Sequence, residues 1–335
     1  MKIAVFEVEP WERGAFRSLA KDHDVAFDER ELDAAVAEDH ADAEVISAFI
    51  HSKMSRDVLE KLPNLKFVAT RSTGVDHIDV DYCEEHGIEV ANVPSYGKNT
   101  VAEHAFALLL AVSHRMIEAV DRTRRGDFSQ EGLQGFDLQG RTMGIVGTGD
   151  IGEHAARIAR GFGMQVLAFD VKPREDLARE IGFDYVDLPE LLKRSDVVSL
   201  HVPGSPKTEG MIGADEFAAM KDGAILINTA RGSVVETRAL LEALASGKVA
   251  AAGLDVLPEE PAVREEAELL RTYFRREHDL DTLLADHILL RMRNVVITPH
   301  TAFNTKEAVG RILDTTCENI HGFVDGRAPN IVTAA

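Results

Sequence analysis

The chain contains only two cysteines, Cys83 and Cys317, and it lacks any long apolar run. Two cysteines cannot build a disulfide framework, and sparse cysteine is typical of a reducing compartment, where each serves as a small buried hydrophobic residue. No stretch of about 18 consecutive apolar residues occurs, so we expect no membrane-spanning helix. The N-terminal MKIAVFEVEP is broken by Glu7 and Glu9 and leads into no signal-peptide core. These absences predict a cytoplasmic protein.

Basic residues and metal-binding motifs are also scarce. The 335 residues include 37 Lys and Arg against 57 Asp and Glu, which gives a formal net charge of -20. A surface this acidic repels phosphate backbones and anionic lipids, so we expect neither nucleic acid nor a membrane surface as a partner. The histidines and acids show no HExxH or CxxC spacing, and we therefore predict no metal site.

Short apolar runs alternate with longer amphipathic stretches along the whole chain. Runs of four to eight residues rich in Val and Ile, separated by helical patterns, are typical of parallel strands in βα units. They fall into two sets, and a chain of 335 residues is long enough for two cores. We predict an α/β protein with two doubly wound parallel-sheet domains. The predicted strands are KIAVFEV, DVAFDE, EVISAF, KFVATRS and IEVANVP, then TMGIVG, QVLAFD, DVVSLHVP, AILINTA, VAAAGLDV and NVVITPH.

A boundary between the domains is predicted in the stretch NVPSYGKNT. Its proline, glycine and asparagines favour turns, and Thr100 with Glu103 resembles a capping box at the start of a long apolar helix. We expect that helix to be buried, in part against a second subunit. The closing helix is expected to return to the first domain. The predicted division is therefore residues 1–99 with 301–335 for one domain and 100–300 for the other, with a charged helical excursion at 262–290.

The sequence GTGDIG follows the strand TMGIV and precedes a helical pattern. In this context Gly147 permits a tight turn, Gly149 lets a pyrophosphate approach the backbone, and Gly152 lets helix and strand pack closely. The helix N-terminus, with Asp150 and Ile151, supplies free N–H groups. Glycines needed for turn geometry alone are the alternative. Asp170 ends the next strand, about 20 residues on, where a carboxylate binds ribose hydroxyls and repels a 2′-phosphate. The pattern favours NAD over NADP, although Lys172 and Arg174 nearby could tolerate a phosphate.

Polar residues follow three further strands. Thr229 and Arg231 follow AILIN, Asp255 and Glu260 follow VAAAGL, and His300 follows NVVITP. In an open α/β sheet, ligands bind beyond the carboxyl ends of the strands. We therefore expect these side chains to point toward the bound cofactor.

Five motifs taken in order, GTGDIG, LHVP, NTARGSVV, GLDV…EEP and TPHTAFNT, resemble the D-isomer-specific 2-hydroxyacid dehydrogenase family, and the last is similar to its D-lactate dehydrogenase branch. The resemblance covers nearly the whole chain. It implies a flavodoxin-like substrate domain and an inserted Rossmann NAD-binding domain with a cleft between them. It also implies a homodimer that interconverts a 2-keto acid and a D-2-hydroxy acid with NAD.

The resemblance also assigns roles to residues. Arg231 matches the arginine that holds the substrate carboxylate or polarises its keto oxygen. A planar guanidinium with two parallel N–H donors suits this task. His300 matches the acid/base and Glu260 its carboxylate partner, with Glu259 as the alternative glutamate. Asp255 matches a residue that orients the nicotinamide carboxamide. Further cofactor contacts are implied at Val202, Pro203, Thr208, Thr229 and Ala230.

The substrate pocket is less sharply defined. Backbone N–H groups near Gly74 and Val75 could bind a carboxylate, and Tyr96, Phe49 and Phe303 are candidates for the pocket wall; Phe49 and Phe303 could equally be core aromatics. Asn304 stands where the lactate branch usually has tyrosine. Pyruvate or a slightly larger 2-keto acid is the predicted substrate, with glyoxylate or hydroxypyruvate as the alternative. A dinucleotide-sensing protein on the same fold is a second alternative, and His104 and His201 are interpreted as non-catalytic.

Overall fold

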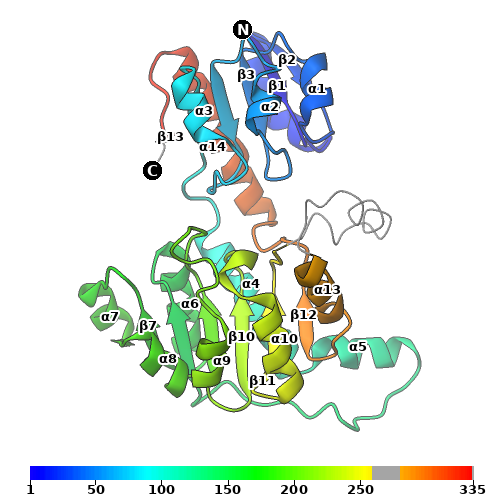
Figure 1. Ribbon diagram of the computed structural model, residues 1–335, viewed down its shortest axis with the longest axis vertical. Helices are drawn as coiled ribbons and strands as arrows, with labels where there is room; N and C mark the ends of the chain where they lie inside the picture. Colours follow the sequence, from blue (N-terminus) through cyan, green and yellow to red (C-terminus); the bar gives the residue numbers. More distant parts are fainter. Residues whose placement is uncertain (259–279, 334–335) are drawn as a thin grey trace. The chain divides into compact units, whose positions relative to one another are not determined.

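The computed structural model describes residues 1–258 and 280–333. The chain divides into two compact units (Figure 1), one made of Met1–Tyr96 with Thr305–Ala335 and the other of Gly97–Asn304. The middle of the chain thus forms one domain, inserted into another that contains both ends. No helix within the described residues is long and apolar enough to cross a membrane.

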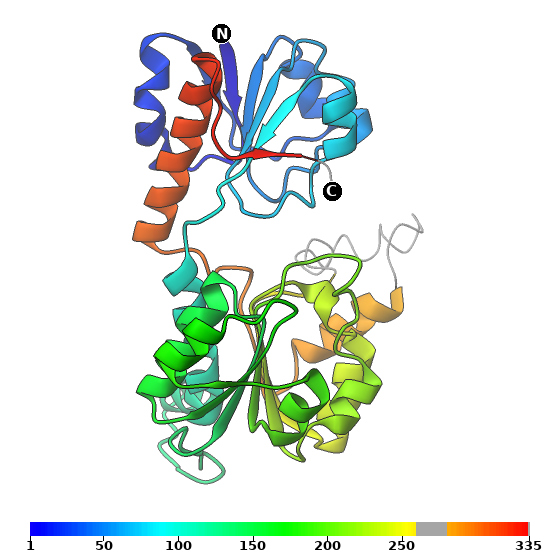
Figure 2. The same cartoon turned by 90° about the vertical axis from the view of Figure 1, so that its left-hand side faces the viewer.

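The described residues of the first unit form a six-stranded sheet with helices on both faces. Val68 and Ile46 belong to a buried cluster beneath helices α1 (Ala34–Asp39), α2 (Arg56–Leu59) and α3 (Val80–Glu85). The ring of Phe67 stacks on Phe323 with centroids 4.4 Å apart, on the face covered by α14 (Lys306–Val324; Figure 2). Neighbouring residues of one strand are therefore both buried, which explains why the strands show no polar alternation. The sheet order is β13 (Ile331–Val332), β5 (Glu89–Ala91), β4 (Phe67–Thr70), β3 (Val45–Ala48), β1 (Lys2–Val5) and β2 (Asp24–Phe27).

The C-terminal segment completes this first unit. Thr305 caps α14 by accepting a hydrogen bond from the Ala308 N–H, and the Asn319 amide donates to the Asn92 carbonyl at 2.8 Å. Strand β13 then pairs antiparallel with β5, while every other pairing in the sheet's described residues is parallel. The expectation that the closing helix returns to the first domain is confirmed.

The described part of the second unit forms a seven-stranded parallel sheet whose strand order reverses between β6 and β9. Its order is β12 (Val295–Ile297), β11 (Val249–Leu254), β10 (Ala224–Asn228), β9 (Val197–Leu200), β6 (Thr142–Val146), β7 (Gln165–Phe169) and β8 (Asp184–Tyr185). This is the doubly wound dinucleotide-binding order, in which ligands bind beyond the carboxyl ends of the strands near the reversal. The predicted pair of doubly wound parallel-sheet domains is confirmed.

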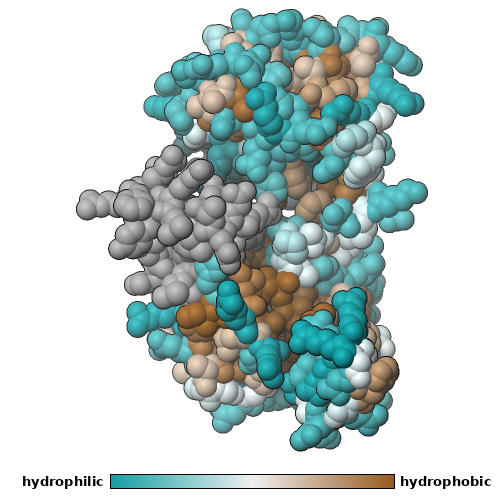
Figure 3. Space-filling view, turned by 90° about the vertical axis from the view of Figure 1, so that its right-hand side faces the viewer, coloured by the Kyte–Doolittle hydropathy of each residue, from teal (hydrophilic) through white to brown (hydrophobic). Residues whose placement is uncertain are grey.

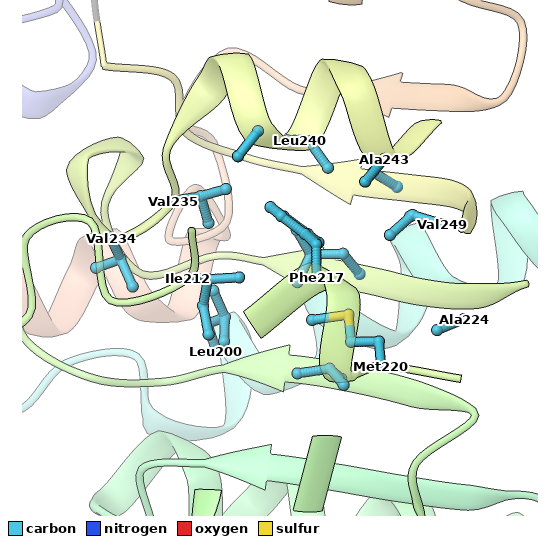
Figure 4. Packing of buried hydrophobic residues seen from close by; sticks show 14 of the residues in the cluster. Leu200, Ile212, Phe217, Met220, Ala224, Val234, Val235, Leu240, Ala243 and Val249 are labelled. Atoms are coloured by element: carbon cyan, nitrogen blue, oxygen red, sulfur yellow. The ribbon is translucent and has the colours of Figure 1, made fainter. Parts of the chain in front are cut away.

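Two buried clusters cover the two faces of this sheet. One packs Ile145 and Ile225 against α4 (Lys98–Ser113), α6 (Asp150–Gly161) and α7 (Glu175–Ile181). The other packs Leu200 and Leu226 against α8 (Leu188–Arg194), α9 (Ala214–Ala219) and α10 (Thr237–Ser246). Figure 4 shows Phe217 of α9 in the middle of the second cluster, among Leu200, Ile212 and Leu240. Packing on both faces fixes the strand ends that carry the site.

All eleven predicted strand segments contain strands, but three local expectations need correction or limitation. Strands β8 and β13 were missed because each has only two residues, too few to show a strand pattern. Helix α4 begins at Lys98, with Gly97 as its N-cap, so Thr100 lies inside the helix and does not cap it. Of the charged helical stretch predicted at 262–290, the last part is helix α13 (Leu280–Leu289), and residues 262–279 lie outside the described residues.

Candidate active site

The loop between β6 and α6 shows what each of its three glycines does. Gly147 has φ +94°, and a Cβ there would lie 2.6 Å from the His201 carbonyl oxygen. A Cβ on Gly152 would lie 1.9 Å from the Gly147 carbonyl oxygen, so helix and strand are in close contact at this residue. Gly149 is the N-cap of α6, and a Cβ on it would meet no described atom within 4 Å. Two glycines are thus required by packing, and the third leaves an open approach to the helix N-terminus.

Asp170 lies directly after β7, beside this loop. Its carboxylate accepts hydrogen bonds from the Thr148 N–H at 2.6 Å, the Thr148 hydroxyl at 2.9 Å and the Lys172 N–H at 2.8 Å. Partial burial acts to raise the pKa of Asp170, but these hydrogen bonds and the nearby Arg174 hold the pKa below its ordinary value. The group is therefore a carboxylate at neutral pH, the state that its predicted contact with ribose hydroxyls requires.

Two basic residues around the loop, Arg174 and Lys98, are already paired. The Arg174 guanidinium donates to the Thr148 carbonyl and lies 3.2 Å from a Glu153 carboxylate oxygen. Asp150, in the first turn of α6, forms a 2.7 Å ion pair with Lys98. A 2′-phosphate would have to compete with Glu153 for Arg174, which supports NAD over NADP.

The other predicted cofactor contacts follow β9 and β10. Thr208 donates from its hydroxyl to the Pro203 carbonyl at 2.7 Å, which folds the segment after β9 on itself. Val202 is half-buried and Ala230 is buried. The Thr229 hydroxyl is buried and has no hydrogen-bond partner within the described residues. A buried polar atom of this kind needs a partner, and the polar groups of a dinucleotide would provide one. Together with the open face of Gly149, this makes the residues present compatible with NAD.

His201 lies next to the glycine loop but is poorly suited to proton transfer. Its Nε2 lies 2.9 Å from the Ser199 hydroxyl, and its Nδ1 is buried without a partner in the described part of the chain. Burial lowers the pKa of His201 to about 4, so the imidazole is neutral at physiological pH. This agrees with the prediction that His201 is not catalytic.

Arg231 is presented by a turn that the buried Asn228 stabilises. The Asn228 side chain donates to the Arg231 carbonyl at 2.9 Å and accepts from the Ala230 N–H at 3.0 Å. One guanidinium nitrogen of Arg231 donates to the Ala230 carbonyl at 2.9 Å. The Arg231 side chain passes close to Gly204, where a Cβ would lie 2.9 Å from its Cγ. Sequence reasoning missed Asn228, although an asparagine ending a buried strand is a signal for such a turn.

Asp255 organises the segment that follows β12. Its carboxylate is 1% exposed and accepts from the Thr298 hydroxyl and from the N–H groups of Thr301 and Ala302, both at 2.9 Å. Burial acts to raise the pKa of Asp255, but hydrogen bonds from His104, Thr298 and the two N–H groups outweigh it and hold the pKa below its ordinary value. Asp255 is therefore a buried anion around which residues 298–302 fold. Its predicted contact with the nicotinamide carboxamide stays a prediction.

His300 adopts a left-handed backbone conformation, with φ +53°. Its N–H donates to the Asp255 carbonyl at 2.9 Å and to the Thr298 carbonyl at 3.0 Å. Non-glycine residues in this region cost on the order of 1 kcal/mol each and persist only where their surroundings enforce them. The main chain of His300 is thus held in place by Asp255 and Thr298. Glu260, its predicted partner, and Glu259 lie outside the described residues.

In the second unit, the predicted residues gather at one edge. The glycine loop, Asp170, Val202, Arg231 and His300 follow parallel strands of the same sheet, so they share its carboxyl edge. Phe303 is half-buried in the segment that follows His300. Among the described residues, no group of three or more His, Cys, Asp or Glu side chains could hold a metal ion.

The predicted substrate residues of the first unit also follow neighbouring parallel strands. Phe49 follows β3, the Gly74 and Val75 loop follows β4, and Tyr96 follows β5. The Gly74 carbonyl accepts from the Ser72 hydroxyl at 2.6 Å, which fixes the loop. Neither Gly74 nor Val75 donates its N–H to an acceptor within the described residues. Their predicted contact with a substrate carboxylate stays a prediction.

Sequence reasoning missed the two charged residues that support this edge. The Glu7 carboxylate accepts from the N–H groups of Phe49, His51 and Ser52 at 2.9, 3.1 and 3.2 Å, and from the Ser52 hydroxyl. Arg71 is 3% exposed and donates to the carbonyls of Phe6 and Glu7. Glu7 itself has φ +51°. The loop that carries Phe49 is thus tied to the end of β1 by a charged side chain.

Comparisons with known proteins agree with this arrangement. Residues 106–302 match the model of the D-isomer specific 2-hydroxyacid dehydrogenase, NAD binding domain. The chain is 35% identical to D-lactate dehydrogenase of Escherichia coli, with 98% of this chain and 99% of that protein covered. It is 39% identical to glyoxylate reductase of Korarchaeum cryptofilum over 86% of this chain and 82% of that protein.

The structure is similar to a crystal structure of D-lactate dehydrogenase from Aquifex aeolicus complexed with NAD and lactic acid. The TM-score is 0.87 at 38% sequence identity, and 99% of each chain is covered. The resemblance seen in the motifs is confirmed over the whole length of the chain. The chain belongs to the D-isomer-specific 2-hydroxyacid dehydrogenases, a family of NAD-dependent oxidoreductases.

Proposed function

We propose that this chain catalyses the reversible reduction of a 2-keto acid to a D-2-hydroxy acid, with pyruvate or a slightly larger analogue as its substrate. One observation carries the proposal. Arg231, Asp255 and His300 follow the adjacent strands β10, β11 and β12 at the carboxyl edge of the NAD-binding sheet. Relatives named D-lactate dehydrogenase and a solved complex with lactic acid support the choice of substrate.

Bound NADH supplies the hydride for the reduction. In our proposal the Arg231 guanidinium binds the substrate carboxylate or the keto oxygen through two parallel N–H donors. His300 donates a proton to the carbonyl oxygen during reduction and takes it back from the hydroxyl during oxidation. The fixed backbone of His300 holds the imidazole at one place for both directions. Glu260 would favour the protonated imidazole through its negative charge.

The substrate carboxylate has a second group of donors in the first unit. The N–H groups of Gly74 and Val75 lie in a loop held by Ser72, and adjacent backbone donors of this kind bind anions well. Phe49, Tyr96 and Phe303 remain the predicted wall of the substrate pocket. Substrate size then depends on these aromatic side chains.

We also propose that two copies of the chain associate through α5 (Met116–Arg124). No residue of this helix is buried, and Met116, Ile117 and Val120 are exposed, as is Phe128 beyond it. Figure 3 shows that hydrophobic residues also gather at the surface of the second unit on the face in view. Exposed apolar residues this close together are typical of an interface.

Light scattering coupled to size-exclusion chromatography tests the homodimer. Ile117→Glu with Val120→Glu places two charges on the apolar side of α5 and should give a monomer. Arg125→Glu changes an exposed residue at the end of the same helix, on the side away from Met116 and Val120, and is the matched control, which should stay dimeric. A dimer that survives the double substitution would place the interface elsewhere.

The function is tested by NADH oxidation against a panel of 2-keto acids: glyoxylate, pyruvate, hydroxypyruvate and phenylpyruvate, each repeated with NADPH. We expect the highest kcat/KM with pyruvate or phenylpyruvate, and a D product by chiral analysis. His300→Ala should reduce kcat by about 100-fold or more while the Kd for NADH stays unchanged. A preference for glyoxylate or hydroxypyruvate would support the reductase alternative, which a relative of that name favours. NADH binding without turnover on any acid would support a sensor.

A further inference from the structure

Helix α4 brings a second histidine to the segment that holds His300. The Nε2 atom of His104 lies 2.9 Å from the Thr298 hydroxyl oxygen and 3.4 Å from a carboxylate oxygen of Asp255. The His104 side chain is 22% exposed, so the contact is partly shielded from water. An imidazole in the middle of an apolar helix thus contacts two residues that lie far from it along the chain.

The hydrogen-bond donors in this cluster can be assigned from its chemistry. The Asp255 carboxylate can only accept, so the Thr298 hydroxyl donates its single proton to Asp255. The Thr298 oxygen is then an acceptor toward His104, which requires that His104 carries a proton on Nε2. His104 therefore donates from Nε2 to Thr298. The Asp255 carboxylate, 3.4 Å from the same nitrogen, is also stabilised by this N–H.

Both residues that His104 contacts set the backbone of His300. The His300 N–H donates to the carbonyls of Asp255 and Thr298, and its φ is +53°. A strained backbone is kept only where several contacts enforce it together. The Asp255 carboxylate also needs several donors, because a buried anion that loses one is strongly destabilised. Removing the His104 donor would therefore weaken the positions of Asp255 and Thr298, the two residues whose carbonyls accept from the His300 N–H.

We propose that His104 is a positioning residue for the acid/base step, holding Asp255 and Thr298 and through them the backbone of His300. This inference rests on the proposed role of His300. His104 contacts neither substrate nor cofactor in this proposal, so its loss should affect the rate of the chemical step more than cofactor binding. A small displacement of an acid/base from its reacting atom is enough to cost about 10- to 100-fold in rate.

Two amide substitutions separate positioning from simple packing. His104→Gln places an amide N–H near the location of the imidazole Nε2, while His104→Asn has the same polarity but a shorter reach. We expect kcat to fall by about 10- to 100-fold in the Asn variant and by less than about threefold in the Gln variant. The Kd for NADH should stay within about twofold of wild type in both. His114→Gln is the matched control, because His114 is exposed at the end of the same helix.

Hydrogen exchange gives a readout independent of turnover. The N–H groups of Thr301 and Ala302 donate to Asp255, so their exchange should accelerate in His104→Asn and stay slow in His104→Gln. If His104→Asn fails to fold, Thr298→Val removes the same link with little change of shape, and it should lower kcat in the same way. Equal kcat and equal exchange in the Asn and Gln variants would overturn the inference. Absence of turnover in the wild-type protein would instead overturn the proposed function, and this inference with it.

Discussion

Replacing Gly149 and Gly152 by alanine, one at a time, should separate cofactor binding from folding within a single loop. The two residues are three apart in sequence and differ in their surroundings. A Cβ on Gly152 would lie 1.9 Å from the Gly147 carbonyl oxygen and 3.4 Å from Ile145. A Cβ on Gly149 would meet no described atom within 4 Å, and its φ of -60° suits any residue.

The expected magnitudes follow from these distances. For Gly152→Ala, a backbone atom must move by more than 1 Å to reach an ordinary contact distance of about 3.4 Å, and overpacking of this kind costs about 1–3 kcal/mol or more. For Gly149→Ala, two effects on stability nearly cancel: alanine restricts the unfolded chain, which stabilises the fold, but it is a poorer N-cap than glycine. The unfolding free energy should therefore change by less than about 0.5 kcal/mol. The added methyl group would instead meet the pyrophosphate. A loss of about 1.4–2.8 kcal/mol raises the Kd for NADH by about 10- to 100-fold.

Urea unfolding and NADH titration of both variants measure the two quantities. Gly161→Ala, at the end of α6 with no described atom within 4 Å of its Cβ, is the control; it should leave the Kd for NADH unchanged and raise stability by at most about 1 kcal/mol, because alanine favours the helix. Wild-type NADH affinity in Gly149→Ala would refute the reasoning that this glycine admits the pyrophosphate. Wild-type stability in Gly152→Ala would refute the packing argument.

Three further predictions concern carboxylates. Asp170→Ser removes the charge that faces a 2′-phosphate, so the ratio of kcat/KM for NADPH to that for NADH should rise at least about tenfold in steady-state assays; an unchanged ratio would contradict the assignment. Glu7→Gln replaces an oxygen that accepts from the Phe49 loop by a donor, and the urea unfolding free energy should fall by about 1–3 kcal/mol, whereas no loss would show that the loop does not depend on Glu7. The pKa of Asp255 is held below its ordinary value near 4, so its contribution to stability is complete above that value and is lost as the pH falls through the lower folded-state pKa. Asp255→Asn should therefore flatten the decline of the unfolding free energy below about pH 4, and equal slopes in the two proteins would count against this reasoning.

The sequence predicted the strands well because each buried strand is an apolar run, and the order of the runs defines the doubly wound topology. The glycine loop was equally clear, since the GxGxxG pattern after a strand is local in sequence and the tight contact at Gly152 is with Gly147, five residues away. The link from His104 to Thr298 could not be predicted, because the two residues are 194 apart in sequence and the helix around His104 is apolar whatever its partner. The same holds for Glu7, whose acceptor role depends on residues 42 or more positions away. Gly97 is the N-cap of α4 in place of Thr100, because the helix begins three residues earlier than the capping pattern indicated.

The discontinuous first unit has a consequence for synthesis of the chain. Strand β4 leaves the ribosome early, but Phe67 meets Phe323 and β5 meets β13 only when the last residues have been made. The second unit is continuous and can fold in the meantime. At about 5–20 residues per second, its translation takes roughly 10–40 s, during which one apolar face of the first sheet has no covering helix. Of the two units, the one whose synthesis starts first is thus completed last, and that interval is when the nascent chain most needs protection from aggregation.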